Sequence, residues 1–157
     1  VLFWQWRPLG GIVWDLPHPA VRALLHGGFA AGWLLVLVTT FVINHFDLFG
    51  LRQVSLNLVG RPYTPLRFAT PWLYRTVRHP LYVGWLFAFW ATPTMTLTHL
   101  VFAMALTAYI LVAIRYEERD LIAAHGEAYR RYREKVPMLI PRLGRAVRSA
   151  GGQPQSV

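Results

Sequence analysis

Hydrophobic residues occur in this chain as long runs. Residues 24–43 are 20 positions without a charged side chain, enough to cross roughly 30 Å of hydrocarbon as a helix. Residues 81–114 are 34 consecutive positions without Asp, Glu, Lys or Arg, which is too many for one span and fits two. The pattern predicts an all-α membrane bundle with spans at about 24–43, 81–92 and 99–116. No segment alternates as a strand does, so we expect no strand.

The second run is divided by Thr92-Pro93-Thr94. Proline removes a backbone donor and disfavours helix at the residue before it, so the run should turn there. The result is a helical hairpin of two spans. A hairpin returns the chain to its starting side, which places Arg78 and Arg115 on one face of the membrane.

Polar segments flank the hairpin. Residues 44–80 carry five arginines among glycine and prolines, which is typical of turns and short pieces in a connector. The last span should continue as a helix to about His125, because Gly126 suits a helix end, and a second short helix follows at 127–136. Residues 117–141 then form a helical cap.

The two ends of the chain differ in composition. Residues 1–6 resemble the end of an apolar span that began upstream, so we treat the chain as lacking an N-terminal part. Residues 142–157 are basic and then rich in Gly, Ser, Gln and Pro, and we expect them to be disordered. The expected organisation is one membrane domain over 1–141 and a basic tail.

The formal net charge is +9, but its distribution argues against nucleic-acid binding. Fourteen of the 16 basic residues lie in two blocks, 52–78 and 115–148, separated by the apolar hairpin. The positive-inside rule places both blocks in the cytoplasm. Hydrophobic residues make up 55% of the chain, which also favours a lipid bilayer as its surroundings.

Several kinds of chemistry are excluded. Without cysteine the chain has no disulfide, zinc-thiolate site or cysteine nucleophile. The six histidines lack the spacing of a helical metal site, and His45 with Asp47 is more often the end of a span than a metal ligand pair, so no metal is expected. No P-loop, GxGxxG segment or nucleophile elbow is present.

The first candidate site lies where the chain re-enters the membrane, at Arg78-His79-Pro80-Leu81-Tyr82-Val83-Gly84. Proline at the first helical position favours a helix start, whose unpaired amides attract an anion such as a carboxylate. Arg78, His79 and Tyr82 could add charge and hydrogen bonds, and Gly84 would allow a ligand or a neighbouring helix to approach. The alternative is an ordinary arginine, proline and tyrosine at a membrane boundary.

The second candidate site is the acidic group Glu117, Glu118 and Asp120 beyond the last span. A carboxylate can bind two ribose hydroxyls or a cation. These residues could equally pair with neighbouring arginines on a solvated helix face. Tyr129 and Tyr132 could cover a cofactor, although aromatic residues at helical spacing more often simply pack.

The two sites form one joint pattern, Arg78-His79-Pro80-x-Tyr82-x-Gly84 followed by Glu117-Glu118-x-x-Leu121-x-x-x-His125-Gly126-x-x-Tyr129-x-x-Tyr132-x-x-x-Val136-Pro137. This pattern resembles the isoprenylcysteine carboxyl methyltransferase superfamily, except at His125, where the family commonly has Phe. Residues 44–53, 60–64 and 89–96 are similar to its bacterial branch of membrane-bound methanethiol S-methyltransferases. The resemblance runs from about Leu2 to Pro141.

The resemblance implies a five-span enzyme of the bacterial inner membrane, of which this chain holds the last three spans. Such an enzyme converts a small thiol, methanethiol, to dimethyl sulfide with S-adenosylmethionine bound on the cytoplasmic side. The implied cofactor-binding residues are Arg78, His79, Pro80, Tyr82, Gly84, Glu117, Glu118, Tyr129 and Tyr132. The implied catalytic residues are Arg115 and Glu117, with His45, Asp47 and Tyr63 of the connector as candidates for substrate selection or deprotonation.

Three other functions are compatible with the same residues. A carboxyl methyltransferase acting on prenylcysteine or another lipid-like acceptor would share the cofactor pocket. An NADPH-dependent sterol-type reductase would have a similar Arg-His-Pro start and tyrosine-rich end. A non-catalytic membrane module that docks a partner would need neither His79 nor Glu117.

Overall fold

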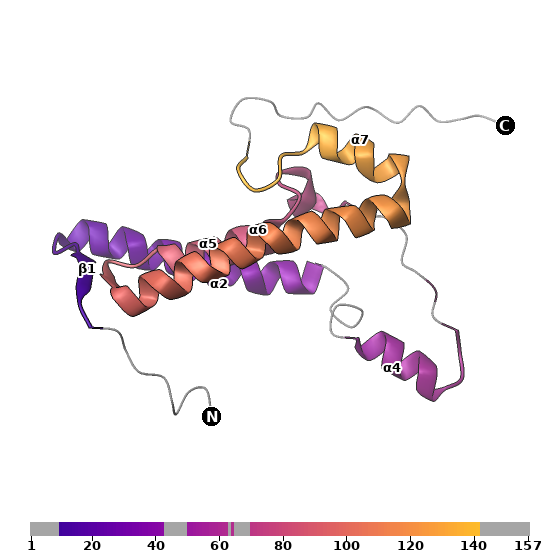
Figure 1. The fold of residues 1–157 in the computed structure, drawn as a ribbon, viewed down its shortest axis with the longest axis horizontal. Helices are drawn as coiled ribbons and strands as arrows, with labels where there is room; N and C mark the ends of the chain where they lie inside the picture. The colour runs from indigo at the N-terminus through magenta and orange to yellow at the C-terminus, as the bar shows by residue number, and fades with distance from the viewer. Residues whose placement is uncertain (1–9, 43–49, 63, 65–69, 142–157) are drawn as a thin grey trace.

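The computed structural model describes residues 10–42, 50–62, 64 and 70–141. The chain is mostly helical, as the apolar runs predict (Figure 1). The elements in chain order are β1 (Ile12–Asp15), α2 (Pro19–Val42), α4 (Leu51–Leu58), the 3₁₀ helix η1 (Trp72–Arg75), α5 (Pro80–Trp90), β2 (Thr94–Thr96), α6 (Leu97–His125) and α7 (Glu127–Lys135).

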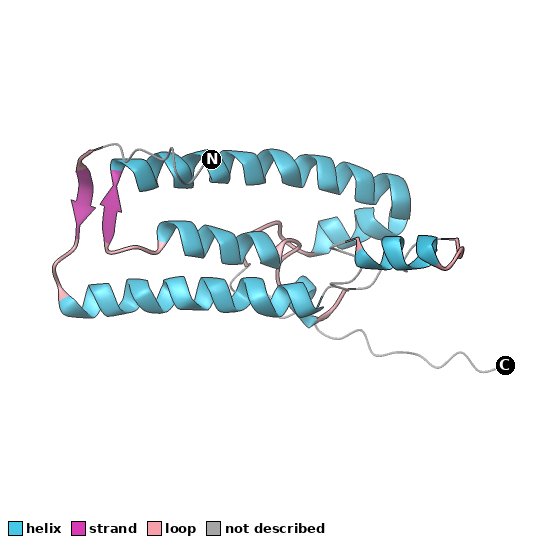
Figure 2. Cartoon of the chain, turned by 90° about the horizontal axis from the view of Figure 1, so that it is seen from below, coloured by secondary structure: helices cyan, strands magenta, loops and turns pink. Residues whose placement is uncertain are grey.

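Three helices lie side by side, with α5 between α2 and α6 (Figure 2). Two of them, α2 and α6, are long and apolar enough to cross a membrane. Helix α5 has 11 residues, or about 16 Å of helix, which is roughly half the thickness of the hydrocarbon layer. The described residues therefore contain two candidate spans and a shorter apolar helix, where three spans were predicted.

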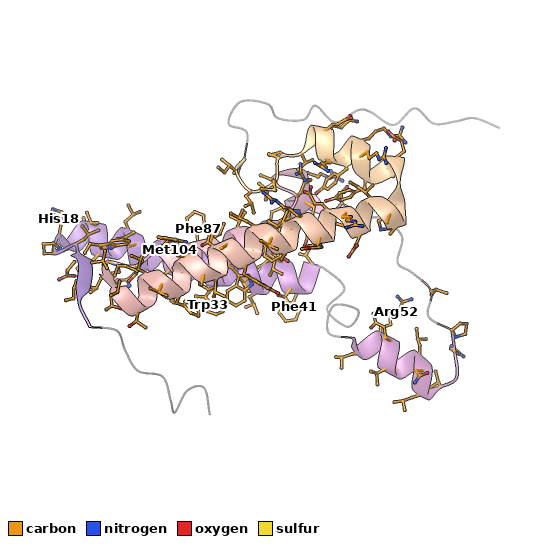
Figure 3. All side chains as sticks on the ribbon, viewed as in Figure 1. His18, Trp33, Phe41, Arg52, Phe87 and Met104 are labelled. Atoms are coloured by element: carbon orange, nitrogen blue, oxygen red, sulfur yellow. The ribbon has the colours of Figure 1, made fainter. Side chains whose placement is uncertain are left out.

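The outer surface of these helices is apolar. The side chains of Trp33, Phe87 and Met104, which Figure 3 labels, are 44%, 53% and 57% exposed. Their exposure is expected of side chains that contact lipid, because a soluble protein rarely leaves so many large apolar groups in water.

Helices α2 and α5 touch through their backbones. A Cβ atom on Gly32 would lie 2.8 Å from the Gly84 carbonyl oxygen and 2.8 Å from the Ala88 nitrogen. A Cβ atom on Gly84 would lie 2.8 Å from the Gly32 carbonyl oxygen. Small residues allow such close contact between membrane helices. This contact holds α5 against α2, and so positions the first candidate site.

The strands β1 and β2 pair antiparallel, with Asp15 opposite Thr94, so the expectation of no strand was wrong. Each strand has only three or four residues, too few to show alternation. The pairing also joins segments 79 residues apart, with the Thr94 hydroxyl donating to Asp15 at 2.7 Å. Local sequence could not indicate it, because the turn after α5 brings the strands together.

The helix ends largely follow the predicted signals. Pro93 lies in the turn after α5, and α6 ends at His125, where Gly126 has a φ of 55° that favours glycine. Helix α2 begins at Pro19, five residues before the predicted start of the span, because proline is well tolerated in the first helical turn.

Candidate functional site

The chain entering α5 is joined to the segment that follows α7. The backbone N–H of Arg78 donates to the Pro137 carbonyl at 2.9 Å, and that of His79 donates to the Met138 carbonyl at 3.2 Å. In Figure 1, α7 lies beside the C-terminal end of α6. The two sequence motifs, some 40 residues apart, therefore meet at one end of the helical bundle.

The buried carboxylate of Glu118 links α5, α6 and α7 at this end of the bundle. The Glu118 Oε1 atom accepts from Arg78 Nε at 2.8 Å and lies 3.1 Å from His79 Nε2. The Glu118 Oε2 atom lies 3.4 Å from Arg133 Nε. Arg78 also donates to the carbonyls of Arg133 and Val136 at 2.9 and 2.6 Å. Because a charge buried without a partner is costly, this ion cluster holds α5, α6 and α7 together.

A cavity of about 610 Å³ opens beside the ion cluster. This volume lies in the range of small-molecule sites. One face of α6 supplies Glu117, Asp120, Leu121 and Ala124, at spacings of i, i+3, i+4 and i+7. The remaining lining residues are Tyr74, Arg78, His79, Leu81 and Tyr82.

Glu117 is one of two acidic residues that line this cavity. Its side chain is 45% exposed, and its Oε2 atom lies 3.7 Å from His79 Nδ1. Tyr82 lines the same cavity. The rings of His79 and Tyr82 are 5.7 Å apart between centroids. His79, whose side chain is only 4% exposed, therefore lies between the carboxylates of Glu117 and Glu118.

Two tyrosines fasten η1 to α7. The Tyr132 hydroxyl donates to the Tyr74 carbonyl at 2.6 Å. Burial raises the pKa of Tyr132 to about 12, against the opposing effect of Arg78, and Glu118 raises it further. Burial likewise raises the pKa of Tyr74, and the nearby Glu117 carboxylate adds to this. Both phenols therefore stay neutral at ordinary pH, and the Tyr132 hydroxyl keeps the proton that it donates.

The structure brings together part of the predicted cofactor-binding set. Arg78, His79, Tyr82 and Glu117 line the cavity, and Glu118 is buried beside them. No role was predicted for the cavity residues Tyr74, Leu81, Leu121 and Ala124, and Asp120 was predicted only as part of the acidic group. Their helical spacing with Glu117 could have revealed the three α6 residues, Asp120, Leu121 and Ala124.

Other predicted site residues lie elsewhere. Pro80 is buried as the first residue of α5, and Gly84 contacts α2, which is the neighbouring-helix role considered for it. Tyr129 is buried with its ring 5.7 Å from that of Tyr132, and neither lines the cavity. Arg115 is exposed and is not among the lining residues.

The connector candidates His45, Asp47 and Tyr63 lie outside the described residues, so their roles stay predictions. Within the ranges that the structure does describe, no group of three or more His, Asp or Glu side chains could hold a metal ion.

Curated proteins of known name match most of the chain. It is 57% identical over 145 residues, 92% of its length, to the methanethiol S-methyltransferase of Crocosphaera subtropica. It is 55% identical over 141 residues, 90% of its length, to that of Mycobacterium tuberculosis. This chain is similar to the methanethiol S-methyltransferases. The resemblance inferred from the motifs is thereby confirmed.

The match covers the relatives only in part. The chain spans 57% and 58% of the length of these two methanethiol S-methyltransferases. A lower similarity, 29% over 128 residues and 75% of the chain, links it to nurim of Xenopus laevis. No protein-family profile matches the chain. No solved structure matches it.

Proposed function

We propose that this chain forms the catalytic region of a membrane enzyme that transfers a methyl group from S-adenosylmethionine to methanethiol, giving dimethyl sulfide. The observation that carries the proposal is the cavity of about 610 Å³, in which the Arg-His-Pro-x-Tyr motif meets Glu117 of α6. The similarity to methanethiol S-methyltransferases, which extends over both motifs, supports the same reaction and acceptor.

The cavity has the groups that S-adenosylmethionine needs. Carboxylates of Glu117 and Asp120 can accept hydrogen bonds from ribose hydroxyls, and Leu121 and Ala124 provide an apolar wall for the adenine. The first amides of α5 have no partner within the helix, and with Arg78 they favour the carboxylate of the methionine end. When bound, the cofactor supplies a sulfonium-activated methyl group.

The surroundings favour methyl transfer to a thiolate. A thiolate, not a thiol, is the nucleophile, and its reaction with a sulfonium removes a pair of opposite charges. A site with little water favours that step over the separated ions. Methanethiol is small and apolar, so it can reach the cavity through the lipid, while the charged cofactor enters from water.

The proposed topology has three crossings and a cytoplasmic cap. The part of α6 from Leu97 to Glu118 is about 32 Å long, which is enough to cross the hydrocarbon layer. Helix α5 together with the extended segment after it covers the same distance. Among the described residues, Arg22 is the arginine at the strand end of the bundle. Many basic side chains lie at the cavity end. The positive-inside rule therefore places the cavity and α7 in the cytoplasm of the bacterial cell.

The test is binding of S-adenosylmethionine and release of dimethyl sulfide by the full-length protein in detergent, supplied with methanethiol. We expect both signals. Glu117→Gln should weaken cofactor binding roughly tenfold, the loss of about one charge-assisted hydrogen bond. The control Glu134→Gln, on an exposed part of α7, should bind normally.

Each of the other outcomes supports a different function. Binding without dimethyl sulfide would indicate a prenylcysteine or other lipid-like acceptor. Binding of NADPH in place of S-adenosylmethionine would indicate a reductase, and a folded protein that binds neither would indicate a docking module.

A further inference from the structure

We infer that His79 accepts the proton of the thiol at its Nδ1 atom, and that Glu118 orients the ring for this step. The inference rests on the proposed function. It gives His79 a role different from the cofactor-binding role that the resemblance implies.

Glu118 lies between two arginines. Its carboxylate contacts the guanidinium groups of Arg78 and Arg133, at 2.8 and 3.4 Å. A carboxylate between two guanidinium groups is ionised and can only accept hydrogen bonds. At 3.1 Å from Glu118, His79 Nε2 must therefore donate.

The contact with Glu118 sets the tautomer of His79. A ring that donates from Nε2 to a carboxylate carries its proton there when it is neutral, which leaves a lone pair on Nδ1. A carboxylate prepares the imidazole base of serine hydrolases in the same way, but there the two ring nitrogens are exchanged. His79 is held from both sides, since its backbone N–H donates to Met138 and its ring faces Glu118.

The Nδ1 atom of His79 is available to a substrate. The nearest oxygen of Glu117 is 3.7 Å from Nδ1, which is too long for a hydrogen bond. His79 and Glu117 both line the cavity, and Nδ1 is the ring nitrogen that lies next to Glu117. Glu117, Glu118 and Tyr82 face the ring itself. The other charged or titratable side chains that line the cavity are Tyr74, Arg78 and Asp120, and Arg133 contacts Glu118 from α7.

Proton transfer from the thiol comes before methyl transfer. The S–H bond of the thiol breaks and its proton moves to Nδ1 of His79, forming an imidazolium between the carboxylates of Glu117 and Glu118. The thiolate sulfur then forms a bond to the methyl carbon, while the electron pair of the broken carbon–sulfonium bond stays on the donor sulfur. Two neutral thioethers result, and the proton later leaves the imidazolium for water.

Glu117 is the alternative base, and its lower basicity disfavours it. An imidazole is ordinarily a stronger base than a carboxylate by about two pKa units. Its pKa is therefore closer to that of a thiol, which favours proton transfer from the thiol to the imidazole. Glu117 instead faces the positive charge that forms on His79.

The experiment compares two acceptors in the full-length protein and in its His79→Gln variant. Methanethiol must lose a proton before it reacts, whereas an aromatic thiol such as thiophenol is largely ionised at neutral pH. We expect His79→Gln to slow methylation of methanethiol on the order of 10²-fold or more, and methylation of thiophenol less than about tenfold. Added imidazole should partly restore methanethiol turnover in His79→Ala.

Two measurements without turnover accompany it. Calorimetry should show that His79→Gln binds S-adenosylmethionine within about threefold of the unchanged protein, which also proves that it is folded. Nitrogen-15 NMR of the cofactor-free protein, assigned by the signal missing in His79→Gln, should place the proton of the neutral His79 ring on Nε2.

An equal loss of rate for both thiols, a loss of cofactor binding in His79→Gln, or a proton on Nδ1 of the neutral ring would overturn the inference. These outcomes are distinct from failure of the proposed function. That failure would appear in the unchanged protein, as the absence of dimethyl sulfide.

Discussion

At the scale of single residues, Tyr132 connects the cap to the chain that enters α5. Its hydroxyl donates to the Tyr74 carbonyl at 2.6 Å, and burial raises the pKa of Tyr132 to about 12. In an unfolded chain the tyrosine pKa is about 10, so between these values the folded state binds more protons. The stabilisation is therefore complete below about pH 10 and is lost as the pH rises towards 12.

Tyr132→Phe should change this alkaline behaviour. Loss of the hydrogen bond should cost about 1 kcal/mol at neutral pH, and the fall in stability above pH 10 should become less steep because one titrating phenol is gone. The midpoint of denaturant unfolding, measured in detergent against pH, tests this. Tyr116→Phe is the control, since Tyr116 is 61% exposed. An alkaline slope identical to that of the unchanged protein would contradict the pKa assignment.

At the scale of helices, the contact of α2 with α5 decides where the first motif lies. Gly32→Ala would place a methyl group 2.8 Å from backbone atoms of α5, which cannot move aside as a side-chain tip can. We expect a loss of about 1–3 kcal/mol, seen as a lower thermal unfolding temperature, together with weaker cofactor binding because α5 shifts.

The matched control is Gly27→Ala, on the same helix. A Cβ atom there would meet nothing within 4 Å, and alanine favours helix by up to about 1 kcal/mol. This variant should be as stable as the unchanged protein or slightly more stable. If both variants behaved alike, the close approach of the two backbones would not matter for stability.

At the scale of the whole molecule, the proposed orientation predicts which end reagents can reach. The chain contains no cysteine, so single cysteines can be introduced without background from it. A membrane-impermeant maleimide should label Ile12→Cys in cells with a permeable outer envelope, and Ala128→Cys only in inverted membrane vesicles. Labelling of Ala128→Cys from outside would reverse the topology.

The sequence by itself determined the helical class, the turn at Pro93 and the end of α6 at Gly126. These features depend on local properties, namely runs of apolar residues and the backbone preferences of proline and glycine. The same local signals identified the two motifs that carry Arg78, His79, Tyr82 and Glu117.

Only the tertiary structure decided how these motifs combine. The strand pair, the position of Tyr74 beside α6, and the burial of Glu118 among Arg78, His79 and Arg133 join segments that are far apart in the chain. No local pattern encodes such contacts, because the charge partner of a carboxylate and the orientation of an imidazole are set by packing between elements. The inferred role of His79 depends on that packing.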